Sequence, residues 1–225
     1  MADNISRIFA AAVAIDPARP LLTWYDDATG ERTELSGATL ANWVAKTANL
    51  MVDEVGAGPG GRAAVLLPPH WQTAAVLLGC WSAGVEVTAA PGEVDALFAT
   101  VERAAEAAAW SAGEQYALAL HPLAAPLREV PAGFTDYVVQ VRGQGDHFTP
   151  YPFGETLVAE AIDRAGELAI AAGERVLIDV GRNPDPLDWL LAPLATGSSV
   201  VLCANLDRDK LTDRIAVERV TVPLA

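Results

Sequence analysis

The fold of this chain is indicated most clearly by the stretch Gly58-Pro59-Gly60-Gly61-Arg62-Ala63-Ala64-Val65-Leu66-Leu67-Pro68. The glycine-rich part, from Gly56 to Gly61, ends the helix that precedes it. The apolar run Ala63–Leu67 that follows predicts a short strand, which Pro68 stops. This order of helix, tight break and apolar strand is the unit from which the rest of the chain can be interpreted.

Alternating strands and helices extend to both sides of this stretch. Upstream, 21–25 and 32–35 flank a turn cluster and predict a hairpin, and Ser36 begins a helix with apolar residues at three- and four-residue spacing. Downstream, 71–82 predicts an apolar helix and 85–88 a strand. Such alternation predicts an α/β fold of layered, mostly parallel sheets flanked by helices.

The second half repeats the alternation after an interruption. Residues 92–115 are alanine-rich and predict a helix, whereas prolines and glycines dominate 121–152, where only 137–141 predicts a strand. The elements predicted beyond are helices at 155–171, 187–194 and 207–217 and strands at 175–180, 199–203 and 219–222. We therefore expect a first α/β subdomain at 1–120, a Pro/Gly-rich connection at 121–152 and a second α/β subdomain at 153–225.

Composition limits the classes of partner. The net charge is −14, with 29 acidic against 15 basic side chains, so we expect no nucleic-acid partner and no membrane partner. No apolar stretch reaches the ~18 residues of a membrane span, and Met1–Ala14, with Asp3 and Arg7, lacks the apolar run of a signal peptide. Two cysteines, Cys80 and Cys203, lie in apolar stretches. We expect a cytoplasmic protein with buried free thiols.

Several segments resemble the amino-terminal part of adenylate-forming, AMP-binding enzymes of the acyl-CoA synthetase type. The helix before the glycines, the turn before Arg62 and the strand that ends in Leu67-Pro68 resemble the entry segment of those enzymes, with Gly61 where an acidic residue is usual. The other matching segments are 71–85, 172–177, 191–202 and 219–222. Taken whole, the chain resembles a family of short proteins that look like a truncated AMP-binding domain.

This resemblance implies a scaffold whose chemistry is missing. Adenylation needs a Ser/Thr/Gly-rich loop with a lysine that holds the triphosphate, and no such loop occurs between the matching segments. The two lysines, Lys46 and Lys210, lie on predicted amphipathic helices, where we expect a solvated role. We also expect the small carboxyl-terminal domain that carries the family's adenylation lysine to be missing. We therefore expect a pseudoenzyme, with no catalytic residue and no cofactor.

Three hypotheses about function follow. The first is a non-catalytic remnant of the adenylate-forming fold that acts as a binding or interaction module and pairs with itself or with another protein; Trp24, Trp110 and Trp189 are interpreted as surface residues in support of it. The second is a small-molecule or nucleotide-binding protein with a crevice at the carboxyl ends of its strands, where Asp179, Arg182 and Asn183 are the candidate polar groups.

The third hypothesis is one part of a split acyl-adenylating enzyme. No metal site is predicted, because the three histidines are scattered without ligand spacing. If the protein self-associates, we expect the contact at an uncovered sheet edge near Arg219–Val222.

Overall fold

The computed structural model describes residues 4–225, so Asp3 lies outside the described part. The chain forms two compact units: unit 1 comprises Met1–Leu40, Pro69–Trp71 and Gly154–Ala225, and unit 2 comprises Ala41–Pro68 and Gln72–Phe153. These units differ from the expected division at 1–120, 121–152 and 153–225, because the first 40 residues fold with the last 72 and the Pro/Gly-rich stretch belongs to unit 2. Only the boundary near residue 153 is shared.

Unit 1 is built on a five-stranded sheet in the order β10 (Val222–Leu224), β8 (Arg175–Asp179), β9 (Ser199–Ala204), β1 (Pro20–Asp26), β2 (Glu31–Ser36). The predicted hairpin is confirmed, since β1 and β2 pair antiparallel. All other neighbours are parallel, and β1 pairs with β9 in the register Leu22 to Val200 through Asp26 to Ala204. The four parallel strands therefore end at one edge of this sheet.

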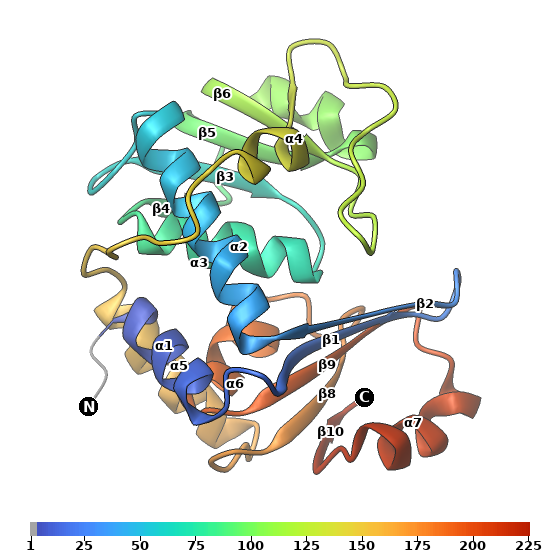
Figure 1. Cartoon of the computed structure of the whole chain (residues 1–225). Helices are drawn as coiled ribbons and strands as arrows, with labels where there is room; N and C mark the ends of the chain where they lie inside the picture. Colours follow the sequence, from blue (N-terminus) through green and yellow to red (C-terminus); the bar gives the residue numbers. More distant parts are fainter. Residues whose placement is uncertain (1–3) are drawn as a thin grey trace. The chain divides into compact units, whose positions relative to one another are not determined.

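Helices cover both faces of this sheet (Figure 1). On one face lie α1 (Ile5–Ile15), α5 (Glu155–Glu167) and α6 (Ala192–Ala195), the last preceded by a π-helical turn at Leu187–Leu191. On the other face lies α7 (Leu211–Glu218), whose Leu211 and Ile215 pack on Leu177, Val201 and Cys203. A short 3₁₀ turn, Arg208–Lys210, precedes α7. Successive side chains of β9 thus point to opposite faces of the sheet, and each face packs in a separate hydrophobic layer.

Unit 2 contains a second five-stranded sheet, in which every pair is parallel, in the order β4 (Glu86–Thr88), β3 (Arg62–Leu66), β5 (Glu93–Thr100), β6 (Ser111–Leu118), β7 (Thr135–Asp136). Its helical segments are the part of α2 (Gly37–Asn49) beyond Leu40 with the π-helical turn Leu50–Glu54, α3 (Trp71–Ser82), the 3₁₀ helix Val101–Ala109 and α4 (Tyr137–Arg142). The predicted α/β fold of layered, mostly parallel sheets is confirmed.

Two predicted elements are wrong. The alanine-rich segment 92–115 is not one helix: it holds the central strand β5, the 3₁₀ helix Val101–Ala109 and the first part of β6. Ala96–Ala99 is a strand because it is a fully buried run between two parallel neighbours, where small and apolar side chains suffice. The segment 137–141 is helical despite its valines. Asp136 caps it, since its carboxylate accepts hydrogen bonds from the backbone amides of Val138 and Val139.

The surface interpretation of two tryptophans is also wrong. Trp24 is 7% exposed and Trp189 1% exposed. Trp24 packs edge-on against the buried ring of His70, with ring centres 4.8 Å apart, and Trp189 donates from its indole nitrogen to the carbonyl of Pro184 at 3.2 Å. Both belong to the interior of unit 1, so they lend no support to a partner surface.

Helices α2 and α3 meet closely in unit 2 at Gly79. A Cβ atom at this position would overlap the side chain of Thr47. Thr47 is fully buried, and its hydroxyl is held by the carbonyl of Trp43 at 2.8 Å and by the Tyr137 hydroxyl at 2.7 Å. Because these hydrogen bonds fix Thr47, the absence of a side chain at Gly79 is what permits the contact.

Gly79→Ala is therefore expected to lower the free energy of unfolding by about 1–3 kcal/mol through overpacking, although alanine favours a helix by ~1 kcal/mol. The control is Gly166→Ala in α5, where nothing lies within 4 Å of the added Cβ; it should raise the free energy of unfolding by about 0.5–1 kcal/mol. Urea unfolding followed by circular dichroism measures both. Equal effects of the two variants would contradict the close contact.

Charged side chains tie α7 to the sheet of unit 1. Arg214 donates to both carboxylate oxygens of Asp27, at 2.6 and 2.9 Å, and its guanidinium lies 4.2 Å from the centre of the Tyr25 ring. One turn later, Glu218 accepts from Arg175 at 2.5 Å, from the Tyr25 hydroxyl at 2.6 Å and from Arg32 at 3.0 Å. The spacing of four residues places Arg214 and Glu218 on the same side of the helix.

The Asp27–Arg214 pair is well shielded from water, since the two side chains are 6% and 7% exposed. The hydrogen bonds from Arg214 outweigh burial and lower the pKa of Asp27 to about 2. An unfolded aspartate titrates near pH ~4. The stability that this carboxylate contributes is therefore complete above about pH 4 and is lost as the pH falls toward about 2.

Asp27→Asn should lower the free energy of unfolding at neutral pH by about 2–3 kcal/mol, because it leaves Arg214 buried without a counter-charge. The difference in the free energy of unfolding between Asp27→Asn and the unsubstituted protein should become smaller as the pH is lowered toward about 3. Asp26→Asn is the control: Asp26 accepts from Asn205 and from the amide of Ala28, and no cationic side chain between residues 4 and 225 contacts it, so we expect a loss under ~1 kcal/mol. Urea titrations at several pH values provide the test, and a pH-independent difference would argue against it.

Candidate functional site

The polar residues predicted to line a crevice lie at the carboxyl edge of the sheet of unit 1. Asp179 is the last residue of β8, and Arg182 and Asn183 lie in the loop that follows. The Asp179 carboxylate accepts from the amide of Gly181 at 3.1 Å and from Arg208 at 3.2 Å, whereas Arg182 stays 3.9 Å away. Asn183 donates to the carbonyls of Asp179 and Leu224. The structure thus brings all three together around the end of β8.

Most charges at this edge satisfy one another. Asp27, at the end of β1, accepts from Arg214 and from the amide of Asp207, and Lys210 lies 3.6 Å away. Arg182 is the most exposed of the predicted residues, with 66% of its side chain accessible. Asp179 and Asn183 therefore anchor the loops after β8 and β9, and the predicted ligand-binding role of the three residues stays a prediction.

Lys46 has a structural role in unit 2. Its ammonium group contacts the carboxylate of Asp146 at 2.6 Å and the carbonyl of Gln144 at 2.5 Å, and its side chain is only 21% exposed. Asn49, one turn later, donates to the carbonyls of Gly145 and His147. The solvated role expected for Lys46 is therefore wrong: α2 holds the 144–147 segment in place.

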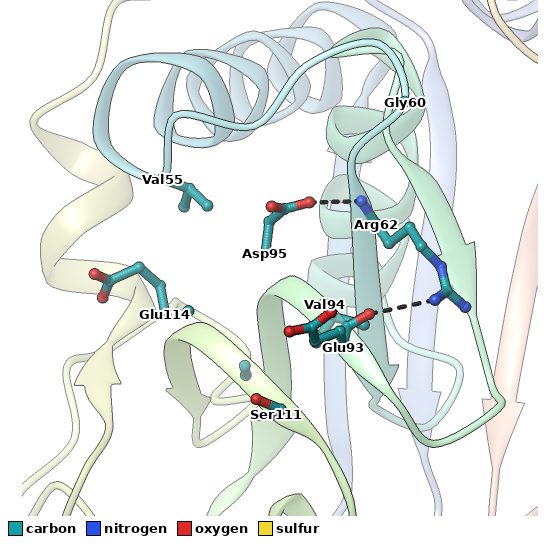
Figure 2. Close-up of a pocket in the computed structure, with 10 residues that line it drawn as sticks. Val55, Gly60, Arg62, Glu93, Val94, Asp95, Ser111 and Glu114 are labelled. Carbon is teal, nitrogen blue, oxygen red and sulfur yellow. Dashed lines mark hydrogen bonds between the residues drawn. The ribbon is translucent and has the colours of Figure 1, made fainter.

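A cavity of about 500 Å³ opens at the amino ends of β3, β5 and β6 in unit 2 (Figure 2). Three carboxylates line it, those of Glu93 and Asp95 on β5 and Glu114 on β6. Arg62 at the start of β3 lies at one side and Val55 at the other. The strands β5 and β6 are parallel neighbours, with Glu93 opposite Ser111 and Ala96 opposite Glu114. The three acids therefore lie near the amino ends of these strands, at the same rim of the cavity.

Asp95 and Arg62 are already engaged within the cavity wall. One Asp95 oxygen accepts from the backbone amide of Arg62 at 2.8 Å, and the Arg62 guanidinium contacts the carbonyl of Glu93 and the hydroxyl of Thr88. A Cβ atom at Gly61 would lie 3.0 Å from that Asp95 oxygen. The carboxylate of Asp95 thus occupies the space beside Gly61, the position where the sequence resemblance leads one to expect an acidic side chain.

Glu93 and Glu114 differ from Asp95, whose carboxylate accepts a hydrogen bond from the backbone amide of Arg62. Across residues 4–225, neither carboxylate has a hydrogen-bonding or ion-pair partner. The cavity is therefore a concave, solvent-open site with free negative charge, suited to binding a cationic group. Sequence reasoning missed it because 92–115 was interpreted as a helix, which would have dispersed these acids over a solvated face.

Other kinds of site find no support in the described residues. No group of three or more His, Cys, Asp or Glu side chains there is arranged to hold a metal ion. Between residues 4 and 225 there is also no helix with the length and apolar character needed to cross a membrane. Cys80 and Cys203 are buried free thiols, as predicted, and burial raises the pKa of each, to about 12 and about 11.

Comparison with known proteins identifies the fold. An acyl-CoA synthetase from Brucella canis superposes with a TM-score of 0.70 at 16% identity over 99% of this chain and 52% of its own. An acetoacetyl-CoA synthetase from Streptomyces lividans superposes with a TM-score of 0.71 at 17% identity over 96% of this chain and 41% of its own. The chain therefore spans about half the length of these enzymes, and the resemblance to the amino-terminal part of adenylate-forming enzymes is confirmed at the level of the fold.

A much nearer relative is known by sequence. No family model matches the chain. A TIGR03089 family protein from Mycobacterium tuberculosis (strain ATCC 25618 / H37Rv) is 45% identical over 222 residues, which cover 92% of this chain and 91% of the relative. Its length is thus close to that of the present chain. With this identity over nearly the whole of both proteins, the chain belongs to the TIGR03089 protein family and has the fold of the amino-terminal part of an adenylate-forming enzyme.

Proposed function

We propose that this protein is a non-catalytic binding module of the adenylate-forming fold, and that the cavity at the amino ends of β3, β5 and β6 binds a small cationic ligand. The observation that carries this proposal is the pair of unpartnered carboxylates, Glu93 and Glu114, in a cavity of about 500 Å³. That volume falls within the range of roughly 300–1,000 Å³ in which small molecules are bound.

The charges in the cavity of unit 2 and at the carboxyl edge of the unit 1 sheet favour a cationic ligand over a nucleotide. Three carboxylates in the cavity would repel a triphosphate. At the carboxyl edge of the unit 1 sheet, where open α/β sheets commonly bind ligands, Arg208 and Arg214 are already engaged by Asp179 and Asp27. A phosphate group there would have to compete with these internal carboxylates, which weakens the case for an adenylate site.

Calorimetric titration of the full chain with spermidine, Mg-ATP and AMP tests the proposal. We expect saturable heat with spermidine alone. The double variant Glu93→Gln/Glu114→Gln should weaken spermidine binding by roughly tenfold or more, because it removes both free charges. The control Glu102→Gln/Glu129→Gln removes two exposed acids of unit 2 that do not line the cavity, and it should bind spermidine like the unsubstituted protein.

Three outcomes would contradict the proposal. The first is the absence of heat with spermidine. The second is equal weakening of spermidine binding in the two double variants, which would indicate general attraction to an acidic surface. The third is saturable binding of Mg-ATP. The last would favour the split acyl-adenylating enzyme instead.

A further inference from the structure

The two unpartnered carboxylates of the unit 2 cavity stand apart along the strands. Glu93 on β5 lies opposite Ser111, so Glu114 lies three residues further along β6. At about 3.3 Å per residue, this offset is roughly 10 Å along the strand direction. Figure 2 shows the side chain of Glu114 extending away from Glu93. A single ammonium group pairs with a carboxylate only within about 4 Å, so it contacts one of the two at a time.

The wall between these two carboxylates is apolar or already engaged. Val94 and Ala112 lie opposite each other there and pack in one hydrophobic cluster. Asp95 has one oxygen bound to the backbone amide of Arg62 at 2.8 Å, and the Arg62 guanidinium donates to the carbonyl of Glu93 at 3.3 Å. The cavity therefore presents two separate anionic ends with a less polar stretch between them.

The end of the cavity at Glu114 carries further negative charge. Burial raises the pKa of Tyr116 to about 12, and the charges of Glu114 and Glu54 add to this effect, so both acids lie close to that ring. The Glu54 carboxylate accepts from the neutral side chain of Gln144 at 3.3 Å. A positive group bound at Glu114 is thus attracted by two acids.

We propose, on the basis of the function proposed above, that the ligand of this cavity is a linear amine with an ammonium group at each end. One ammonium pairs with Glu93 and the other with Glu114, while the methylene chain between them lies along Val94 and Ala112. When one ion pair has formed, the second forms within the same molecule, at a high effective concentration. A compact dication such as magnesium has the same charge but cannot span the two carboxylates.

Calorimetric titration of the full chain with monoamines and terminal diamines matched in chain length, from butane to octane, tests this inference. We expect the best diamine to bind roughly tenfold or more tightly than the monoamine of the same length, because it forms two ion pairs. Affinity in the diamine series should pass through a maximum, because only a chain that matches the separation reaches both carboxylates. Magnesium chloride should weaken diamine binding no more than sodium chloride of equal ionic strength.

Single substitutions show whether both ends are used. Glu93→Gln and Glu114→Gln should each lower the affinity of the best diamine to about that of its monoamine, and should change monoamine affinity by less than about twofold, because one carboxylate remains. The matched control Glu102→Gln removes an exposed acid outside the cavity, and it should bind the diamine like the unsubstituted protein. Thermal unfolding verifies that each variant is folded.

The outcomes separate this inference from the function on which it rests. Equal affinity for matched monoamines and diamines, unchanged diamine affinity in Glu114→Gln, or displacement of the diamine by magnesium would overturn the two-ended ligand. The cavity would still be a cation site if amine binding is lost in Glu93→Gln/Glu114→Gln. Absence of heat with every amine would overturn both.

Discussion

The parallel pairing of β1 with β9 is the contact on which unit 1 depends. It joins residues 22–26 to residues 200–204 and so brings the hairpin into a sheet that otherwise consists of the last part of the chain. Asp27 follows directly after β1, and Tyr25 lies within it, so the same pairing delivers two of the groups that Arg214 contacts. The position of α7 is thus a consequence of the strand register.

Local patterns in the sequence predicted much of this fold. The hairpin, the helix 71–82 and the strands predicted at 175–180 and 199–203 all follow from periodicity and turn residues, and the structure confirms them with ends shifted by one residue in the two strands. Where prediction failed, long-range contacts decided. Ala96–Ala99 is a strand because β3 and β6 pair on either side of it, and residues 137–142 are a helix because Asp136 caps them and Tyr137 reaches Thr47.

The candidate site was less predictable than the fold. Asp179, Arg182 and Asn183 were found because they follow a recognisable strand, and the structure does gather them at a sheet edge. No local pattern could have revealed that Arg208 is a partner of Asp179, since it is 29 residues away in sequence. The acids of the cavity come together only through the register of β5 against β6, and that register cannot be known when the segment is interpreted as a helix.

The interleaving of the two units has a consequence for how the protein is made. The chain passes from one unit to the other four times, after residues 40, 68, 71 and 153. During synthesis, all residues of unit 2 have emerged once residue 153 is available, whereas unit 1 also needs β9 and β10, which follow it in the chain. The β1–β2 hairpin precedes unit 2 in the chain, so it must remain unpaired with β9 while the whole of unit 2 is made.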